Sequence, residues 1–190
     1  MRNFGFRVAL LATFFAIAAA ASAEVKLPAI FSSGMVMQQQ TTANLWGTAT
    51  PSSVIKINVG WNKTVYTAKA DNQGKLKFSV KTQAAEGPSS LKSKEGKTDL
   101  IGNITRISNV LIGELWICSG QSNMEMPMKG FKNQPVDNAN MDVLHSTDAA
   151  LRLFTVKRNS TFMPVDTLNG NWDEATPASV REFSATAYYF

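Results

Sequence analysis

Residues 111–123 read Leu-Ile-Gly-Glu-Leu-Trp-Ile-Cys-Ser-Gly-Gln-Ser-Asn, an apolar run that ends in a turn containing glycine. Residues 111–118 lack the clean alternation of a half-exposed strand, which indicates a strand covered on both faces, as in an α/β domain. The chain before Val110 has a different character, with short alternating runs and frequent turn residues. This change predicts two domains, residues 24–110 and residues 111–190.

The first predicted domain has the pattern of an all-β sandwich. Apolar and polar side chains alternate at 54–59, 64–68 and 76–80, and a period of two places one face of each strand inward. Turn-forming residues separate these runs at intervals of about ten residues, as in β-sandwiches. They lie at 51–53, 60–62, 71–74 and 86–88.

The second predicted domain has the order of a β-α-β unit. After the apolar run, residues 137–145 indicate a short helix capped by Asp137 or Asn138, residues 151–156 a second strand, and residues 179–190 the start of another helix. A parallel sheet needs helices over both faces, and a segment with only two strands is too short to form such a covered sheet. We therefore expect the chain to be the front part of a longer protein.

Residues 1–23 have the features of a secretory signal peptide. Arg2 and Arg7 give a positive start, an apolar run follows at 8–20, and small residues at 21–23 offer a cleavage site. The run is shorter than the roughly 20 residues that a membrane-spanning helix needs. The sequence thus predicts export to the periplasm or the extracellular space, a mature chain that begins at Glu24, and no stable membrane anchor.

Charge and cysteine content argue against a nucleic-acid-binding protein and against a disulfide-stabilised one. The 190 residues carry 19 Lys and Arg against 14 Asp and Glu, and removal of the two arginines in 1–23 lowers the net charge from +5 to +3. The lysines are scattered and are not interleaved with aromatic residues, so no nucleic-acid partner is expected. A single cysteine in an exported chain leaves no disulfide framework within it.

The turn at 119–123 (Ser-Gly-Gln-Ser-Asn) is the candidate for chemistry. A strand that runs into a tight glycine turn can lift a serine hydroxyl clear of the backbone and leave neighbouring N–H groups free to receive an oxyanion. Serines beside glycine are also common as plain turn residues. The spacing alone leaves both interpretations open.

Residues 116–128 (WICSGQSNMEMPM) resemble the nucleophile block of the sialate O-acetylesterases, a branch of the SGNH hydrolases that is also related to acetylxylan esterases. Further segments resemble the same family, in the same order along the chain. They are residues 27–31, 34–38, 45–47 and 151–154, Trp172, and residues 183–190.

The resemblance implies an all-β sandwich followed by the truncated start of a flavodoxin-like, three-layer α/β SGNH-hydrolase domain. It places the catalytic nucleophile on Ser122, with its backbone N–H as an oxyanion donor, and gives Gly120, Gln121 and Asn123 a weaker role in shaping the turn or the oxyanion site. The substrate would be an O-acetylated sugar, either sialic acid or a plant or host glycan, and no metal or organic cofactor is implied. The family places the general base and the triad acid in a block outside these residues.

Other residues near the turn have simpler interpretations. His145, the single histidine, stands near the far end of a predicted helix that advances about 1.5 Å per residue, whereas a base must come within about 3 Å of the hydroxyl; we expect a surface histidine. Cys118 is expected to be buried in the predicted strand and to serve packing. Glu125 has no histidine to orient. Met124, Met126 and Met128 are expected to fill gaps in the core and not to form a soft metal site. Trp46, Trp61 and Trp172 are likewise expected to pack and not to stack on sugar rings.

A second hypothesis follows from the missing base, because a serine without one is a poor nucleophile at neutral pH. The chain as it stands would then be a non-catalytic, glycan-binding or scaffold fragment. The sequence also leaves open whether sialic acid or acetylated xylan is the substrate, and it does not indicate an oligomeric state.

Overall fold

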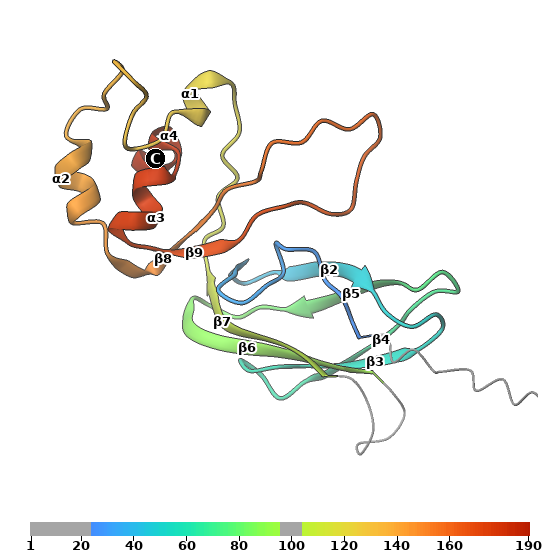
Figure 1. Ribbon diagram of the computed structural model, residues 1–190. Helices are drawn as coiled ribbons and strands as arrows, with labels where there is room; N and C mark the ends of the chain where they lie inside the picture. Colours follow the sequence, from blue (N-terminus) through green and yellow to red (C-terminus); the bar gives the residue numbers. More distant parts are fainter. Residues whose placement is uncertain (1–23, 96–103) are drawn as a thin grey trace, which may run out of the picture.

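The computed structural model describes residues 24–95 and 104–190 (Figure 1). The predicted signal peptide, residues 1–23, lies outside the described residues. The β-rich part contains β1 Val36–Gln38, β2 Thr42–Thr48, β3 Val54–Val59, β4 Val65–Lys69, β5 Lys75–Lys81, β6 Glu86–Glu95 and β7 Ile104–Gly113. The part that follows contains α1 Ser122–Glu125, α2 Ala139–Leu144, β8 Asp148–Phe154, β9 Trp172–Ala175, α3 Pro177–Glu182 and α4 Ala185–Tyr189.

The β-rich part consists of two facing sheets around one core. A five-stranded sheet has the order β1-β7-β6-β3-β4, and β2 pairs with β5 in a second sheet. Side chains alternate between core and solvent along β3 and β5, so Ile55 and Ile57 of the first sheet and Leu45 and Leu76 of the second belong to one buried cluster. The strands predicted at 54–59, 64–68 and 76–80 are confirmed as β3, β4 and β5.

The predicted strand at residues 111–118 is wrong. Strand β7 starts earlier and ends at Gly113, whose partner in β1 is Gln38, and residues 114–120 have no regular structure. No strand of the described chain pairs with residues 114–120, so this segment lies outside the sheet. Trp116 and Ile117 are accordingly 66% and 90% exposed.

The β-α-β layout is not what the described residues form. Strand β8 pairs with β9 in an antiparallel hairpin, and the predicted helix at 179–190 is divided into α3 and α4 because Phe183 leaves the helical conformation. The hydroxyl of Ser184 then caps α4 by accepting a hydrogen bond from the N–H of Ala187. The helix expected at 137–145 is confirmed as α2, with Asn138 as its N-cap.

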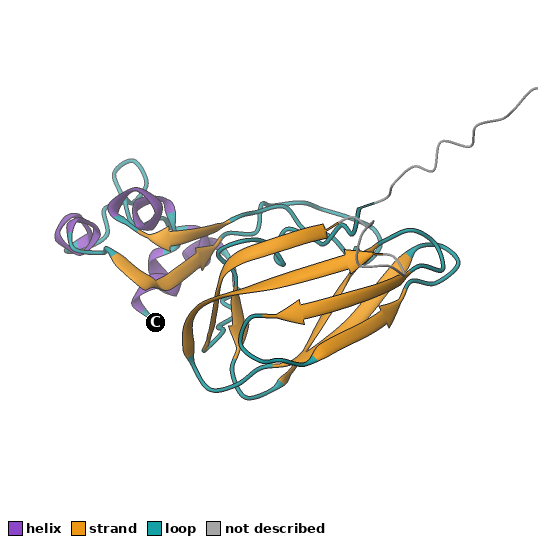
Figure 2. Cartoon of the chain, turned by 90° about the horizontal axis from the view of Figure 1, so that it is seen from below, coloured by secondary structure: helices purple, strands orange, loops and turns teal. Residues whose placement is uncertain are grey.

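The hairpin and the helices share a second, smaller core that includes Met128, Leu153 and Val180. Both views show the helices gathered at one end of the molecule, beyond the two sheets (Figures 1 and 2). Within residues 24–95 and 104–190, no helix is long and apolar enough to span a lipid bilayer.

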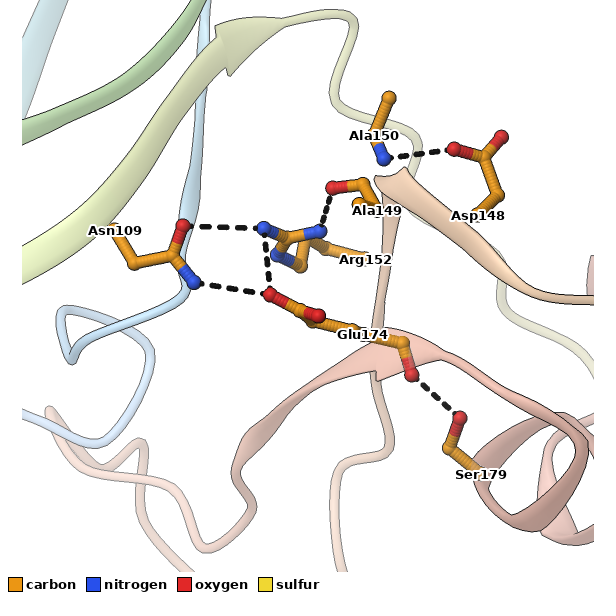
Figure 3. A network of polar contacts seen from close by, with 7 residues as sticks. All are labelled: Asn109, Asp148, Ala149, Ala150, Arg152, Glu174 and Ser179. Atoms are coloured by element: carbon orange, nitrogen blue, oxygen red, sulfur yellow. Dashed lines mark hydrogen bonds and ion pairs between the residues drawn. The ribbon is translucent and has the colours of Figure 1, made fainter.

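A polar network joins the hairpin to the β-rich part (Figure 3). The guanidinium of Arg152 in β8, whose side chain is only 2% exposed, lies 3.1 Å from Glu174 of β9 and donates to the side-chain oxygen of Asn109 at 3.2 Å. The Asn109 amide in turn donates to Glu174 at 3.1 Å. Beside this network, Trp172 donates its indole N–H to the carbonyl of Ile30 at 2.9 Å. These contacts connect β8 and β9 directly to the β-rich part.

Candidate active site

Ser122 is the first residue of α1 and is exposed. Gln121 precedes it as the N-cap, with φ −107° and ψ −143°. A Cβ atom at Gly120 would meet the Cβ of Met124 at 3.5 Å, an ordinary contact distance. Space alone therefore does not require glycine at this position, but the turn does carry the Ser122 hydroxyl to the surface.

The backbone at this turn offers hydrogen-bond donors. The first N–H groups of a helix have no intrahelical partner, and α1 has no side-chain cap to occupy them. The N–H of Met124 already donates to Gln121 O at 2.9 Å. Within the described chain, the side chains of Gln121 and Asn123 are exposed and make no hydrogen bond to another residue. The N–H groups at the start of α1 are therefore not engaged by a side-chain cap.

Helix α1 is contacted by two other parts of the chain. From the start of α4, the hydroxyl of Thr186 donates to Asn123 O at 3.0 Å, and the N–H of Ala185 donates to Met126 O at 2.8 Å. From the β8–β9 connection, Arg158 forms an ion pair with Glu125. Glu125 therefore has a basic partner, but the partner is an arginine and not a histidine.

A cavity of about 1050 Å³ lies next to the turn. Its mostly apolar lining comes from the segment after β7, from the β8–β9 hairpin and from α4, and includes Leu115, Trp116, Cys118, Met124, Phe154 and Phe190. Trp116 and Phe190 meet edge to face with ring centroids 5.1 Å apart. Ser122 is not part of the lining, but Met124 and Cys118 on either side of it are.

His145 does not meet the serine. Its ring Nδ1 lies 2.9 Å from Met141 O at the end of α2, and its side chain is exposed. No hydrogen bond between His145 and Ser122 is present in the part of the chain that the structure describes. The expectation of a surface histidine is confirmed.

Cys118 is exposed, so its predicted burial is wrong. The prediction failed for the same reason as the predicted strand: the segment after Gly113 leaves the sheet, and no described element covers the thiol. The packing role expected of Met128 is confirmed, since this residue is fully buried in the second core.

The three tryptophans that could stack on sugars have structural contacts. The indole of Trp61 is 8% exposed and donates to Lys81 O at 2.8 Å. The indole of Trp46 donates to Asp166 O at 2.8 Å, and its ring meets Phe31 at 4.6 Å. With Trp172 bonded to Ile30, all three fit the packing role that the sequence indicated.

Glu114 anchors the start of the segment that leads to the turn. Its carboxylate accepts hydrogen bonds from the side chains of Gln38 at 3.0 Å and Gln39 at 2.6 Å. These two bonds hold the pKa of the Glu114 carboxyl below its ordinary value of 4.5. The carbonyl of the Gln38 side chain also accepts from the N–H of Leu115 at 2.8 Å. The exit of the chain from β7 is thereby fixed to β1.

Thr186 and Arg158 were not singled out as site residues by the sequence. Both reach α1 from positions that are distant in sequence, 63 residues from Asn123 and 33 residues from Glu125. Thr186 lies within the segment 183–190 that contributes to the family resemblance, and this was the only sequence signal near it. In residues 24–95 and 104–190, no group of three or more His, Cys, Asp or Glu side chains is arranged to hold a metal ion.

Comparison with known proteins places the fold beside the carbohydrate esterases. The structure is similar to the crystal structure of XAC1771, a carbohydrate acetylesterase from Xanthomonas citri, with a TM-score of 0.76 and 30% sequence identity. The similarity covers 87% of this chain and 35% of that one, so the chain spans about a third of the length of XAC1771. No family model and no curated protein matches the chain. The structural likeness supports a relation to carbohydrate esterases.

Proposed function

We propose that the protein to which these residues belong is a serine-type carbohydrate O-acetylesterase of the SGNH class, with Ser122 as its nucleophile. The observation that carries this proposal is the exposed position of Ser122 at the start of α1, directly after the glycine turn. The likeness to a carbohydrate acetylesterase over most of the chain supports it. The family resemblance of residues 116–128 assigns the nucleophile to the same serine.

In this proposal, the Ser122 Oγ attacks the carbonyl carbon of the acetyl ester and loses its proton to a general base. The negative charge that develops on the carbonyl oxygen is received by backbone N–H groups, including that of Ser122. The sugar leaves as an alcohol after it is protonated, and an acetyl-enzyme remains. Water then attacks this ester and releases acetate. No step requires a metal or an organic cofactor.

The base is proposed to be an imidazole from outside residues 1–190. Ser122 has no such partner among the residues described, and His145, the single histidine, is bonded to the end of α2. A serine without a base is a poor nucleophile at neutral pH. The carboxylate that orients the base is proposed to come from the same outside segment, as the family resemblance implies.

Sialic acid is the proposed sugar, because residues 116–128 most resemble the sialate O-acetylesterase block. An acetylated plant glycan such as xylan is the alternative within the same chemistry. Initial rates on O-acetylated sialic acid and on acetylated xylan, measured with one enzyme preparation, decide between them.

We also propose that the protein is exported. N-terminal sequencing of the mature protein would test this, and a start at Glu24 is expected.

The nucleophile is tested with protein expressed from the complete reading frame. Ser122→Ala is expected to lower kcat by about 10³-fold or more, because the covalent step is lost. Ser119→Ala changes the other serine of the same turn and is the matched control, expected to keep nearly full activity. Undiminished turnover by Ser122→Ala would remove the proposal.

A further inference from the structure

Helix α1 cannot fix its own orientation. It has four residues, none of them buried, and no side-chain cap at its N-terminus. Helices shorter than about 12 residues are marginal in water even with favourable sequences. The direction of the Ser122 hydroxyl must therefore be set by contacts that α1 makes with other parts of the chain.

The carbonyl of Asn123 is the point at which those contacts meet. It accepts a hydrogen bond from the Thr186 hydroxyl at 3.0 Å and a longer one from the N–H of Met126 at 3.4 Å. Thr186 belongs to the first turn of α4, which is capped by Ser184. Next to it, the N–H of Ala185 donates to Met126 O at 2.8 Å. The start of α4 thus holds both the middle of α1 and the residue after its end.

The other side-chain contacts with α1 are weaker. The ion pair between Arg158 and Glu125 joins side chains that are 81% and 51% exposed, and solvent-exposed pairs of this kind contribute little. The Ser184 hydroxyl reaches the sulfur of Met124 at 3.4 Å, and a thioether is a weak acceptor. Across residues 24–95 and 104–190, the hydroxyl of Thr186 is the one side-chain group that donates to the backbone of α1.

We propose that Thr186 is a positioning residue for Ser122. By holding Asn123 O, its hydroxyl sets the rotation of α1 and with it the direction of the Ser122 Oγ and N–H. This inference rests on the proposed function, because it matters only if Ser122 is the nucleophile. Small displacements of a reacting group are costly in rate. Thr186 itself is exposed, so the loss of its hydroxyl should affect the reaction far more than the fold.

The test uses protein from the complete reading frame and three variants of α4. Thr186→Val removes the hydroxyl and keeps the shape, Thr186→Ser restores the hydroxyl, and Tyr189→Phe removes a different hydroxyl of α4 that binds Asp142 at 2.6 Å instead of α1. The readouts are kcat and KM on an acetylated sugar, the thermal midpoint, and the rate at which a fluorophosphonate labels Ser122, located by peptide mapping.

For Thr186→Val, we expect kcat and the labelling rate to fall about tenfold, which is the effect expected from the loss of one hydrogen bond that orients the reacting group. KM and the thermal midpoint should be nearly unchanged. Thr186→Ser should recover most of both rates, and Tyr189→Phe should keep the wild-type kcat and labelling rate. A Thr186→Val protein with wild-type kcat and labelling would overturn the inference. So would a loss that Thr186→Ser does not recover, or an equal loss in Tyr189→Phe.

The labelling readout separates this inference from the proposed function. If the wild-type protein hydrolyses acetyl esters but is not labelled at Ser122, both proposals fail. If Ser122 is labelled at the same rate in the wild type and in Thr186→Val, only the role of Thr186 fails.

Discussion

Asn109 shows how one residue can join two parts of the chain. It has a positive φ of 55° and stands where the pairing of β6 with β7 shifts register, between the partners of Ser89 and Leu91. Asparagine tolerates this conformation better than most residues, and a bulge re-aims a side chain away from its strand. The Asn109 amide can therefore reach Arg152 and Glu174 in the hairpin.

The ion pair between the buried Arg152 and the half-exposed Glu174 predicts a difference between two glutamates. Glu174→Gln removes the charge that compensates Arg152, whose side chain is 2% exposed, and should lower the free energy of unfolding by about 2 kcal/mol or more. Glu182→Gln removes an exposed partner of Lys129 and should cost less than about 1 kcal/mol. Urea denaturation of both variants measures this, and equal destabilisation would contradict the buried role of Arg152.

The exposed thiol of Cys118 predicts easy modification. In the 190-residue chain, Ellman's reagent should react with Cys118 under native conditions, because the side chain is exposed and access is one of the determinants of thiol reactivity. The control is the same reaction in denaturant, which should be only modestly faster. A thiol that reacts only after unfolding would show that the segment after β7 is covered.

Helices α2 and α4 are linked by one strong hydrogen bond. The hydroxyl of Tyr189 donates to Asp142 at 2.6 Å, and this bond, with a smaller effect of burial, raises the pKa of Tyr189 from 10.0 to about 12. A tyrosine with a raised pKa stabilises the folded state fully below pH 10. That contribution is lost as the pH rises from 10 to about 12.

Absorbance titration of the tyrosinate tests this link. The wild-type chain should show an ionisation step near pH 12, and Tyr189→Phe should remove that step. Asp142→Asn should move the step back toward pH 10, because the charged acceptor is lost. If Asp142→Asn leaves the titration unchanged, the hydrogen bond between α2 and α4 is not formed in solution.

The elements that could be predicted from the sequence are those with a local signal. Period-two alternation located β3 and β5, and a cap predicted at Asp137 or Asn138 indicated α2. The segment after Gly113 could not be predicted, because an apolar run becomes a strand only if partners pair with it, and pairing is not a local property. The predicted β-α-β layout was wrong for the same reason, because the antiparallel pairing of β8 with β9 is also not a local property. The exposed position of Ser122 agrees with the prediction that the glycine turn lifts its hydroxyl clear of the backbone. The contacts from Thr186 and Arg158 to α1 could not be predicted, because no local sequence pattern indicates them.

At the scale of the whole molecule, the described residues form two hydrophobic cores that differ in size. The larger one fills the space between the two sheets, and the smaller one holds the hairpin, α3 and α4 together. Trp172 and the Arg152 network connect them. The chain corresponds to 35% of the solved acetylesterase, so we propose that the catalytic unit is completed by residues outside these 190.

For the molecule as a whole, we predict that the 190-residue chain alone hydrolyses acetyl esters negligibly. Ser122 is exposed, but no base accompanies it within the described residues, and the single histidine is engaged at α2. The purified short chain and the product of the complete reading frame should be assayed side by side. Robust hydrolysis by the short chain would contradict the proposed origin of the base. Glycan binding without hydrolysis by both proteins would favour a binding or scaffold role.

The central claim, a covalent acetyl-enzyme on Ser122, is tested most directly by trapping that intermediate. Protein from the complete reading frame would be mixed with an O-acetylated sugar, quenched in acid before the steady state, digested, and mapped by mass spectrometry. We predict an acetyl group on the peptide that contains Ser122, at the serine itself, and no acetylation in Ser122→Ala. Release of acetate with no acetyl group on Ser122, or with the group on another residue, would contradict the account.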